Sequence, residues 1–135
     1  MLNLPHDVKL MIKGIDVVFF YSRKLNEMIK WYQDVFEMDF SRDAEDSDWA
    51  EFSFPENPLS ARLAIHAWHK RVEQEVMISF LVDDIHSLVK DLEEKEVELV
   101  GSPVITELED SFFATIRDPE GNLIQISERK QPLSA

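Results

Sequence analysis

Two polar side chains, His66 and Gln125, stand inside short apolar runs that have the length of strands. An imidazole can bind a divalent metal ion, act as a base, or simply be hydrogen-bonded within a sheet. A neutral amide is a weaker metal ligand and is equally compatible with a structural role. Both residues are therefore candidates for a functional site, and the residue types alone leave the structural alternative open.

The other histidines are poorly placed to join His66 in one site. His69 follows it by three residues, so it lies on the opposite face of a strand or beyond the strand's end. His6 belongs to an N-terminal lead-in, and His86 lies on an expected helix. The chain has no cysteine, which excludes disulfides, thiolate metal ligands and a cysteine nucleophile.

Several reaction and partner classes lack support. The sequence contains no glycine-rich phosphate loop, no serine nucleophile elbow and no clustered basic patch. A net charge of -13 repels nucleic acid and anionic membrane surfaces, and it attracts a cationic ligand. We expect neither nucleic acid nor a membrane as a partner.

The length of 135 residues, with 44% hydrophobic residues, suits one compact domain. No apolar run approaches the roughly 20 residues of a membrane-spanning helix. We expect a soluble, cytoplasmic protein with a lead-in over 1–11, one domain over 12–129 and a fraying tail over 130–135.

The strands that carry the candidate residues follow or precede two expected helices, and the apolar positions of the two helices match. Apolar residues recur at intervals of three and four, which is the spacing of one helix face. The matching pairs, each 60 residues apart, are Leu25 and Ile85, Met28 and Leu88, Ile29 and Val89, and Tyr32 and Leu92. An agreement in both spacing and order indicates an internal duplication.

Strands complete each copy. Apolar runs at 14–21 and 76–82 precede the two helices. Turn formers divide the rest of each half into further strands, at 38–44, 48–54 and 62–68 in the first half and at 97–100, 111–117 and 123–128 in the second. The predicted order is βαβββ, twice, in modules of about 12–70 and 74–129, which is an α+β fold.

A helix covers only one face of each module's sheet, so the other face needs a partner. Pairing the modules predicts a cupped mixed sheet around a cavity, with the helices outside. On this reading Val17, Phe19 and Tyr21 face inward and mirror Met77, Ser79 and Leu81. A register shifted by one residue would bring Asp16 inward, but it would also turn Val18 and Phe20 away from the first helix.

The duplicated pattern resembles the vicinal-oxygen-chelate superfamily, which includes glyoxalases, bleomycin-resistance proteins and extradiol dioxygenases. The resemblance covers about residues 12–129. It rests on the duplication and on three motifs, which are Asp118-Pro119-Glu120-Gly121-Asn122, Phe80-Leu81-Val82-Asp83-Asp84-Ile85, and Trp31-Tyr32 followed by Val35-Phe36. It implies the paired βαβββ architecture and, by analogy with relatives, a homodimer.

The resemblance also implies where a metal would bind. Metal-dependent relatives carry ligands on the first and last strands of each half, and these positions fall here at Val17, about His66, Met77 and Gln125. Valine offers no donor and methionine only a soft thioether, which is poorly matched to such ions. We therefore expect no cofactor and a metal-free or metal-poor site, with His66 and Gln125 as weak candidate ligands.

An apolar and aromatic cavity with a few polar anchors is typical of a small-molecule site. The expected ligand-binding residues are Val17, Phe19, Tyr21, Arg62, His66, Trp68, Met77, Ser79 and Gln125, with Ala64 on the same face and Trp49, Glu51 and Ser53 as further candidates. Each aromatic residue among them is also compatible with plain core packing.

We therefore predict a glyoxalase- or bleomycin-resistance-like protein that binds a small organic ligand, with a cationic aromatic compound as one option. Some relatives are metal-free proteins that sequester antibiotics. The alternative is a metal-dependent lyase, isomerase or dioxygenase of the same superfamily with altered ligands. A metal-free enzyme that uses His66 as a base is also compatible, so the sequence leaves open whether a reaction is catalysed.

Overall fold

The computed structural model describes residues 14–42 and 44–131, so the expected lead-in over 1–11 and most of the expected tail lie outside the described residues. Its elements, in chain order, are β1 (Val17–Ser22), α1 (Leu25–Phe36), β2 (Asp39–Ser41), β3 (Trp49–Ser53), β4 (Arg62–Ala67), β5 (Ile78–Leu81), α2 (Ile85–Glu94), β6 (Leu99–Val100), β7 (Thr106–Glu107), β8 (Ser111–Arg117) and β9 (Leu123–Arg129).

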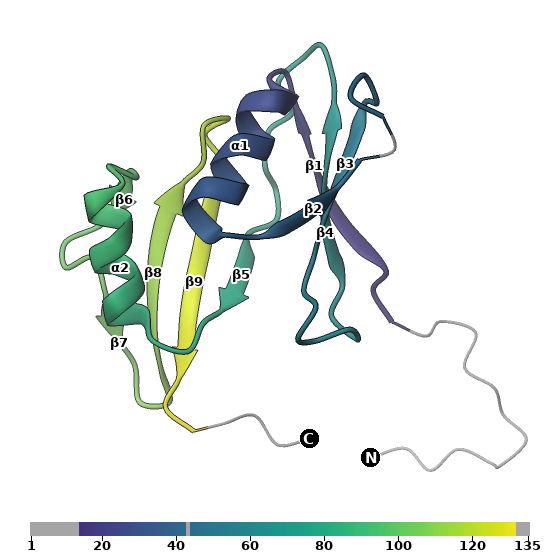
Figure 1. The fold of residues 1–135 in the computed structure, drawn as a ribbon. Coiled ribbons are helices and arrows are strands. Elements are labelled where there is room, and N and C mark those ends of the chain that lie inside the picture. Colours follow the sequence, from purple (N-terminus) through teal and green to yellow (C-terminus); the bar gives the residue numbers. More distant parts are fainter. Residues whose placement is uncertain (1–13, 43, 132–135) are drawn as a thin grey trace, which may run out of the picture.

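The strands form two sheets that lie side by side (Figure 1). The first sheet has the order β1-β4-β3-β2, and the second has the order β5-β9-β8-β6 with the short β7 also paired to β8. In each sheet the strand before the helix runs parallel to the last strand of the same half, and the remaining pairs are antiparallel. The predicted α+β fold of two βαβββ modules is confirmed, and β7 is an addition that the sequence did not predict.

The two helices begin 60 residues apart, at Leu25 and Ile85, as the duplication predicts. Their apolar stripes are buried against the sheets. Tyr32 in α1 and Leu92 in α2, for example, are fully inaccessible to solvent. Asp84 caps α2 by accepting a hydrogen bond from the backbone N–H of Ser87, as expected for this residue type. Within the part of the chain that the structure describes, neither helix is long and apolar enough to cross a membrane.

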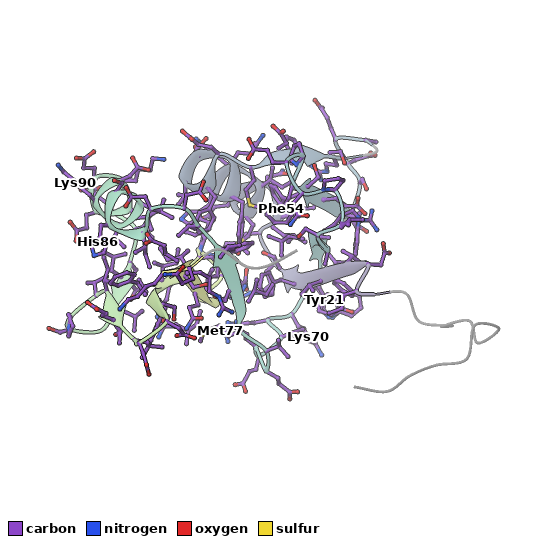
Figure 2. The ribbon with its side chains drawn as sticks, turned by 90° about the horizontal axis from the view of Figure 1, so that it is seen from below. Tyr21, Phe54, Lys70, Met77, His86 and Lys90 are labelled. Atoms are coloured by element: carbon purple, nitrogen blue, oxygen red, sulfur yellow. The ribbon has the colours of Figure 1, made fainter. Side chains whose placement is uncertain are left out.

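Each sheet has a helix-covered face and a face turned away from the helices. In β1 and β4, alternate residues such as Phe20, Leu63 and Ile65 pack into or against the core beneath α1. The residues between them point to the opposite face, because side chains alternate along a strand. Figure 2 shows Tyr21 and Met77 on this side of the molecule, away from the two helices.

The two modules are joined through the turn between β8 and β9. Asp118 Oδ1 accepts hydrogen bonds from the backbone N–H groups of Glu120 and Asn122, at 3.0 and 2.9 Å. Its Oδ2 accepts from the Asn122 side chain at 2.9 Å and from the hydroxyl of Tyr32, in α1 of the other module, at 3.1 Å. Burial raises the pKa of Asp118, although these hydrogen bonds partly oppose the shift. Gly121 has a φ of +94°, a conformation that side chains disfavour.

Glu120 makes the second connection between the modules. Its carboxylate accepts hydrogen bonds from the Ser22 hydroxyl and from Nε of Arg23, both at 2.9 Å. Burial alone would raise the pKa of Glu120, but the hydrogen bonds from Arg23 and Ser22 and the charge of Arg23 outweigh it, so the pKa lies below its ordinary value. The ionised form of Glu120 therefore stabilises the junction between the modules.

Glu120→Gln should lower the free energy of unfolding at pH 7 by about 1–3 kcal/mol, the usual cost of losing charged hydrogen-bond partners in a buried setting. A lowered folded-state pKa adds stability above the ordinary value of 4.5, and this stability is lost as the pH falls through the folded-state value. The difference between Glu120→Gln and the wild type should therefore narrow below pH 4.5. Urea unfolding of both proteins at pH 7 and at acidic pH measures this difference in the free energy of unfolding.

Glu27→Gln is the matched control, because it removes the same charge from a side chain that is 61% exposed. It should change stability by less than about 0.5 kcal/mol. An equal loss for Glu120→Gln at both pH values would contradict a role for the ionised carboxylate.

Phe52 and Phe19 should differ sharply in their contribution to stability. Phe52 lies on the helix-covered face of β3 and is fully buried, whereas Phe19 on the opposite face of β1 is 42% exposed. Phe52→Ala should cost about 3–5 kcal/mol. Phe19→Ala should cost about 1 kcal/mol, as measured by urea unfolding at low protein concentration. Comparable losses would show that the face turned away from the helices is part of the folding core.

Candidate functional site

The predicted site residues of the first half lie on one sheet face. β1 pairs with β4 so that Val17 lies beside Arg62, Phe19 beside Ala64, and Tyr21 beside His66. All six are on the face turned away from α1, because their neighbours in each strand pack beneath the helix. The predicted register is therefore confirmed for β1. Asp16, the alternative inward residue, lies before β1 with a side chain that is 83% exposed.

Four aromatic rings gather around His66 on this face, and we call these five residues the aromatic cluster. The His66 ring centroid lies 5.5 Å from that of Tyr21, 5.8 Å from that of Trp49, and 6.5 Å from those of Phe19 and Trp68. The rings meet edge-on or tilted, which is the preferred geometry for aromatic pairs. Tyr21 and Trp68 remain 37% and 45% exposed. The cluster is thus an open aromatic surface that a flat ligand could cover.

Trp49 and Glu51 belong to the same face, since β3 places them beside His66 and Ala64. The Glu51 carboxylate accepts a hydrogen bond from the Trp49 indole at 2.9 Å, and Nη1 of Arg62 donates to its two oxygens at 2.8 and 2.6 Å. Arg62 also pairs with Asp16 at 3.0 Å. The charge of Glu51, opposed by desolvation and supported by Asp16, raises the pKa of Arg62. Arg62 therefore lies at the expected place but is engaged by protein carboxylates.

The second half contributes a more polar face. β5 pairs with β9 so that Ser79 lies beside Gln125 and Leu81 beside Ser127. Gln125 is half-buried, while Ser79 is exposed and donates a hydrogen bond to the hydroxyl of Ser127 at 3.1 Å. Met77 precedes β5 and is 46% exposed. The sequence correctly placed these side chains on the side away from the helices.

The strand registers change one assignment made from the sequence. The halves correspond at an offset of 60 residues, so Phe19 is equivalent to Ser79. Phe19 pairs with Ala64 and Ser79 pairs with Gln125, which makes Ala64 the counterpart of Gln125. The sequence mapping put His66 at that level. His66 instead lies two residues farther along β4, beside Tyr21. The pairing of strands decides which residues lie side by side, and the order of residues in the chain does not specify that pairing.

The metal positions implied by the superfamily resemblance are therefore Val17, Ala64, Met77 and Gln125. Valine and alanine have no donor atom, and a thioether is too soft for the ions concerned. A single neutral amide supplies neither the three or four ligands nor the negative charge that hold a catalytic divalent ion. These residues do not fit such a metal.

Within residues 14–42 and 44–131, one group of three side chains does bring metal-binding atom types together. Ligand atoms of Asp84, His86 and Glu128 lie within 4.8 Å of one another, at the start of α2. Glu128 already accepts a hydrogen bond from the backbone N–H of Ile85 at 2.8 Å. Hydrogen bonds from Ser87 hold the pKa of Asp84 below its ordinary value. We interpret the two carboxylates as acceptors for the helix start, whose partial positive charge disfavours a cation.

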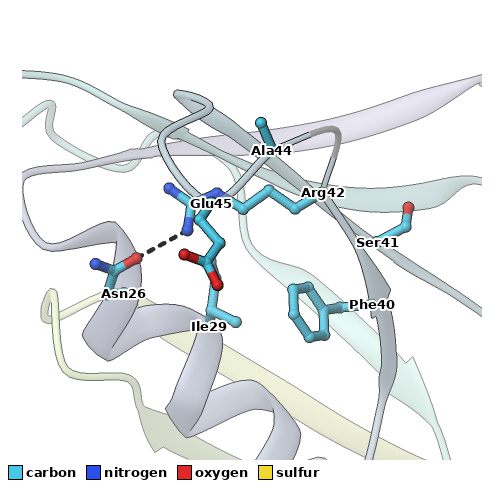
Figure 3. A pocket seen from close by; sticks show the side chains of 7 residues that line it. All are labelled: Asn26, Ile29, Phe40, Ser41, Arg42, Ala44 and Glu45. Carbon is cyan, nitrogen blue, oxygen red and sulfur yellow. Dashed lines mark hydrogen bonds between the residues drawn. The ribbon is translucent and has the colours of Figure 1, made fainter.

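Two open grooves lie beside the strands and helices described above. One, of about 430 Å³, runs between β1 and the segment that precedes β5, and it is lined by Phe19, Tyr21 and Val76. The other, of about 460 Å³, lies between α1 and β2 (Figure 3). There the Arg42 guanidinium donates to the Asn26 side chain at 2.9 Å. Only the first groove includes residues predicted for the ligand site.

Comparisons with solved structures agree on the fold. A member of the glyoxalase/bleomycin resistance protein/dioxygenase superfamily from Sphaerobacter thermophilus DSM 20745 is 16% identical, with a TM-score of 0.72 over 89% of this chain and 100% of that one. TnmS3, an antibiotic binding protein from Streptomyces sp. CB03234, is 15% identical, with a TM-score of 0.69 over 90% and 100%. Lactoylglutathione lyase from Agrobacterium tumefaciens is 16% identical, with a TM-score of 0.69 over 88% and 96%.

A comparison with curated protein sequences gives no match. The family model described as Glyoxalase/Bleomycin resistance protein/Dioxygenase superfamily matches residues 14–126, which cover nearly all of both modules and the turn that joins them. The chain therefore belongs to the glyoxalase/bleomycin resistance protein/dioxygenase superfamily.

Proposed function

We propose that this protein binds a flat aromatic molecule on the aromatic cluster and does so without a catalytic metal. The observation that carries the proposal is the grouping of Phe19, Tyr21, Trp49 and Trp68 around His66 on a sheet face that no helix covers. Exposed aromatic rings offer a large area for stacking at little cost in side-chain entropy.

The charge of the protein favours a ligand that is also cationic. The net charge of -13 attracts cations over the whole surface, and the exposed faces of Tyr21 and Trp68 are suited to cation–π contact. The antibiotic binding protein TnmS3 shows that this fold can serve a binding role, although at 15% identity the likeness concerns the fold.

The rival function is an enzyme of the same superfamily with altered metal ligands. Lactoylglutathione lyase is a solved protein of similar fold. The donor set at Val17, Ala64, Met77 and Gln125 argues against metal-dependent chemistry of that kind here. Binding therefore has more support than metal-dependent catalysis.

A thermal-shift screen of planar aromatic cations, including proflavine and other acridines, should find compounds that raise the unfolding midpoint. A ligand specific for the folded state adds about 2.7 kcal/mol of stability at 100 times its Kd. Trp68→Ala should weaken such a compound by about 0.5–1.5 kcal/mol, because it removes one exposed ring from the cluster. Isothermal titration calorimetry measures the change in Kd.

Leu59→Ala is the matched control, because Leu59 is 96% exposed in the loop between β3 and β4 and lies outside the aromatic cluster. It should leave the Kd unchanged. No shift across a broad screen would contradict the binding function. Near-stoichiometric iron, nickel, zinc or manganese in protein purified without chelators would instead support the enzyme.

We also propose that a second copy of this chain covers the face of the second sheet that is turned away from α2, giving a homodimer that leaves the aromatic cluster of the first sheet to the ligand. This face exposes apolar side chains, among them Met77 and Leu81. The strands β5, β8 and β9 carry no acid on this face, and its two arginines, Arg117 and Arg129, pair with Glu98 and Asp110. Because the strong negative charge of the chain resides elsewhere, two such faces can meet without strong repulsion.

Leu81→Glu should convert the dimer to a monomer, because it places a carboxylate on a side chain that is 60% exposed on this face in both copies. Light scattering coupled to size-exclusion chromatography measures the mass. Leu59→Glu adds the same charge in the loop between β3 and β4 and should remain dimeric. A wild type that is monomeric at all concentrations would contradict the homodimer.

A further inference from the structure

His66 differs from the other members of the aromatic cluster because the protein fixes which of its ring nitrogens carries the proton. Its Nδ1 lies 2.7 Å from the backbone carbonyl oxygen of Ala67. A carbonyl oxygen only accepts hydrogen bonds, so Nδ1 must be the protonated nitrogen at this distance. In the neutral imidazole, Nε2 is then left with a lone pair and acts as an acceptor.

This acceptor is directed away from the backbone, so it can accept a hydrogen bond from a ligand. Nε2 occupies the distal side of the ring, opposite the Nδ1 that faces the main chain. Among the hydrogen bonds formed by residues 14–42 and 44–131, none engages Nε2. The Trp49 indole N–H, a neighbouring donor, is directed to Glu51 instead.

We infer that His66 selects ligands that carry an N–H or O–H donor on an aromatic ring, by accepting that hydrogen bond at Nε2. This inference rests on the proposed binding function and names the ligand class more narrowly. A flat molecule that stacks on Tyr21 and Trp68 removes water from the space beside the His66 ring. A ligand with a donor replaces the hydrogen bond that water made, whereas a ligand without one leaves a desolvated acceptor unpaired.

Two features argue against the other role of a free imidazole nitrogen, metal binding. The ring neighbours of His66 on this face are Phe19, Tyr21, Trp49 and Trp68, and none of them is a good ligand for a divalent ion. The nearby carboxylate of Glu51 is committed to Trp49 and Arg62. A lone imidazole supplies one ligand where stable sites have three or four.

Tryptamine and 1-methyltryptamine test the inference, because both carry a planar indole ring and a cationic ammonium group and only tryptamine has an indole N–H. The wild type should bind tryptamine about 3- to 10-fold more tightly, the range that one hydrogen bond supplies. His66→Phe keeps a ring of similar size without the acceptor, so it should bind the two compounds equally. His66→Gln, which retains an acceptor oxygen, should keep part of the preference. Calorimetric or NMR titration gives each Kd.

The outcomes separate the inference from the function on which it rests. Equal affinity of the wild type for both compounds would overturn the role of His66 and leave the binding function standing. A preference for tryptamine that survives in both variants would assign the selection to another residue and overturn the inference. Failure of the wild type to bind either compound would count against the binding function itself, and the inference would fall with it.

Discussion

The arrangement of the two halves of the molecule depends on the carboxylate of Asp118. It shapes the β8–β9 turn through two backbone N–H groups, and it receives the Tyr32 hydroxyl from α1 of the other half. Burial and the nearby charge of Asp118 raise the pKa of Tyr32 well above its ordinary value, so the phenol remains a donor. Glu120, two residues later, holds the end of β1. A single turn thereby fixes both modules relative to each other.

Much of the fold follows from local pattern. The apolar spacing in α1 and α2 predicts their starts correctly, because a helix buries every third or fourth residue whatever it packs against. The strand over 111–117 was also predicted with the bounds that β8 has. β7 pairs through only Thr106 and Glu107, and two residues are too few to show an alternating pattern.

The sequence predicts which sheet face the candidate residues occupy, but it does not predict the level at which their strands pair. Alternation along β1 and β4 tells which side chains share a face, so the expected residues do lie away from the helices. The level at which strands pair depends on contacts between distant segments, and for this reason Ala64 rather than His66 is the counterpart of Gln125. The engagement of Arg62 by Glu51 and Asp16 is likewise a long-range pairing that no local pattern reveals.

The duplicated halves have diverged in the chemistry of their equivalent faces. In the first, Phe19 and Tyr21 present rings, and in the second the residues 60 positions later are Ser79 and Leu81. The same scaffold therefore presents two aromatic rings on one sheet and a hydroxyl group and an aliphatic side chain on the other. Because the two sets of residues lie on separate sheets, a substitution can change the chemistry of one face without altering the side chains of the other.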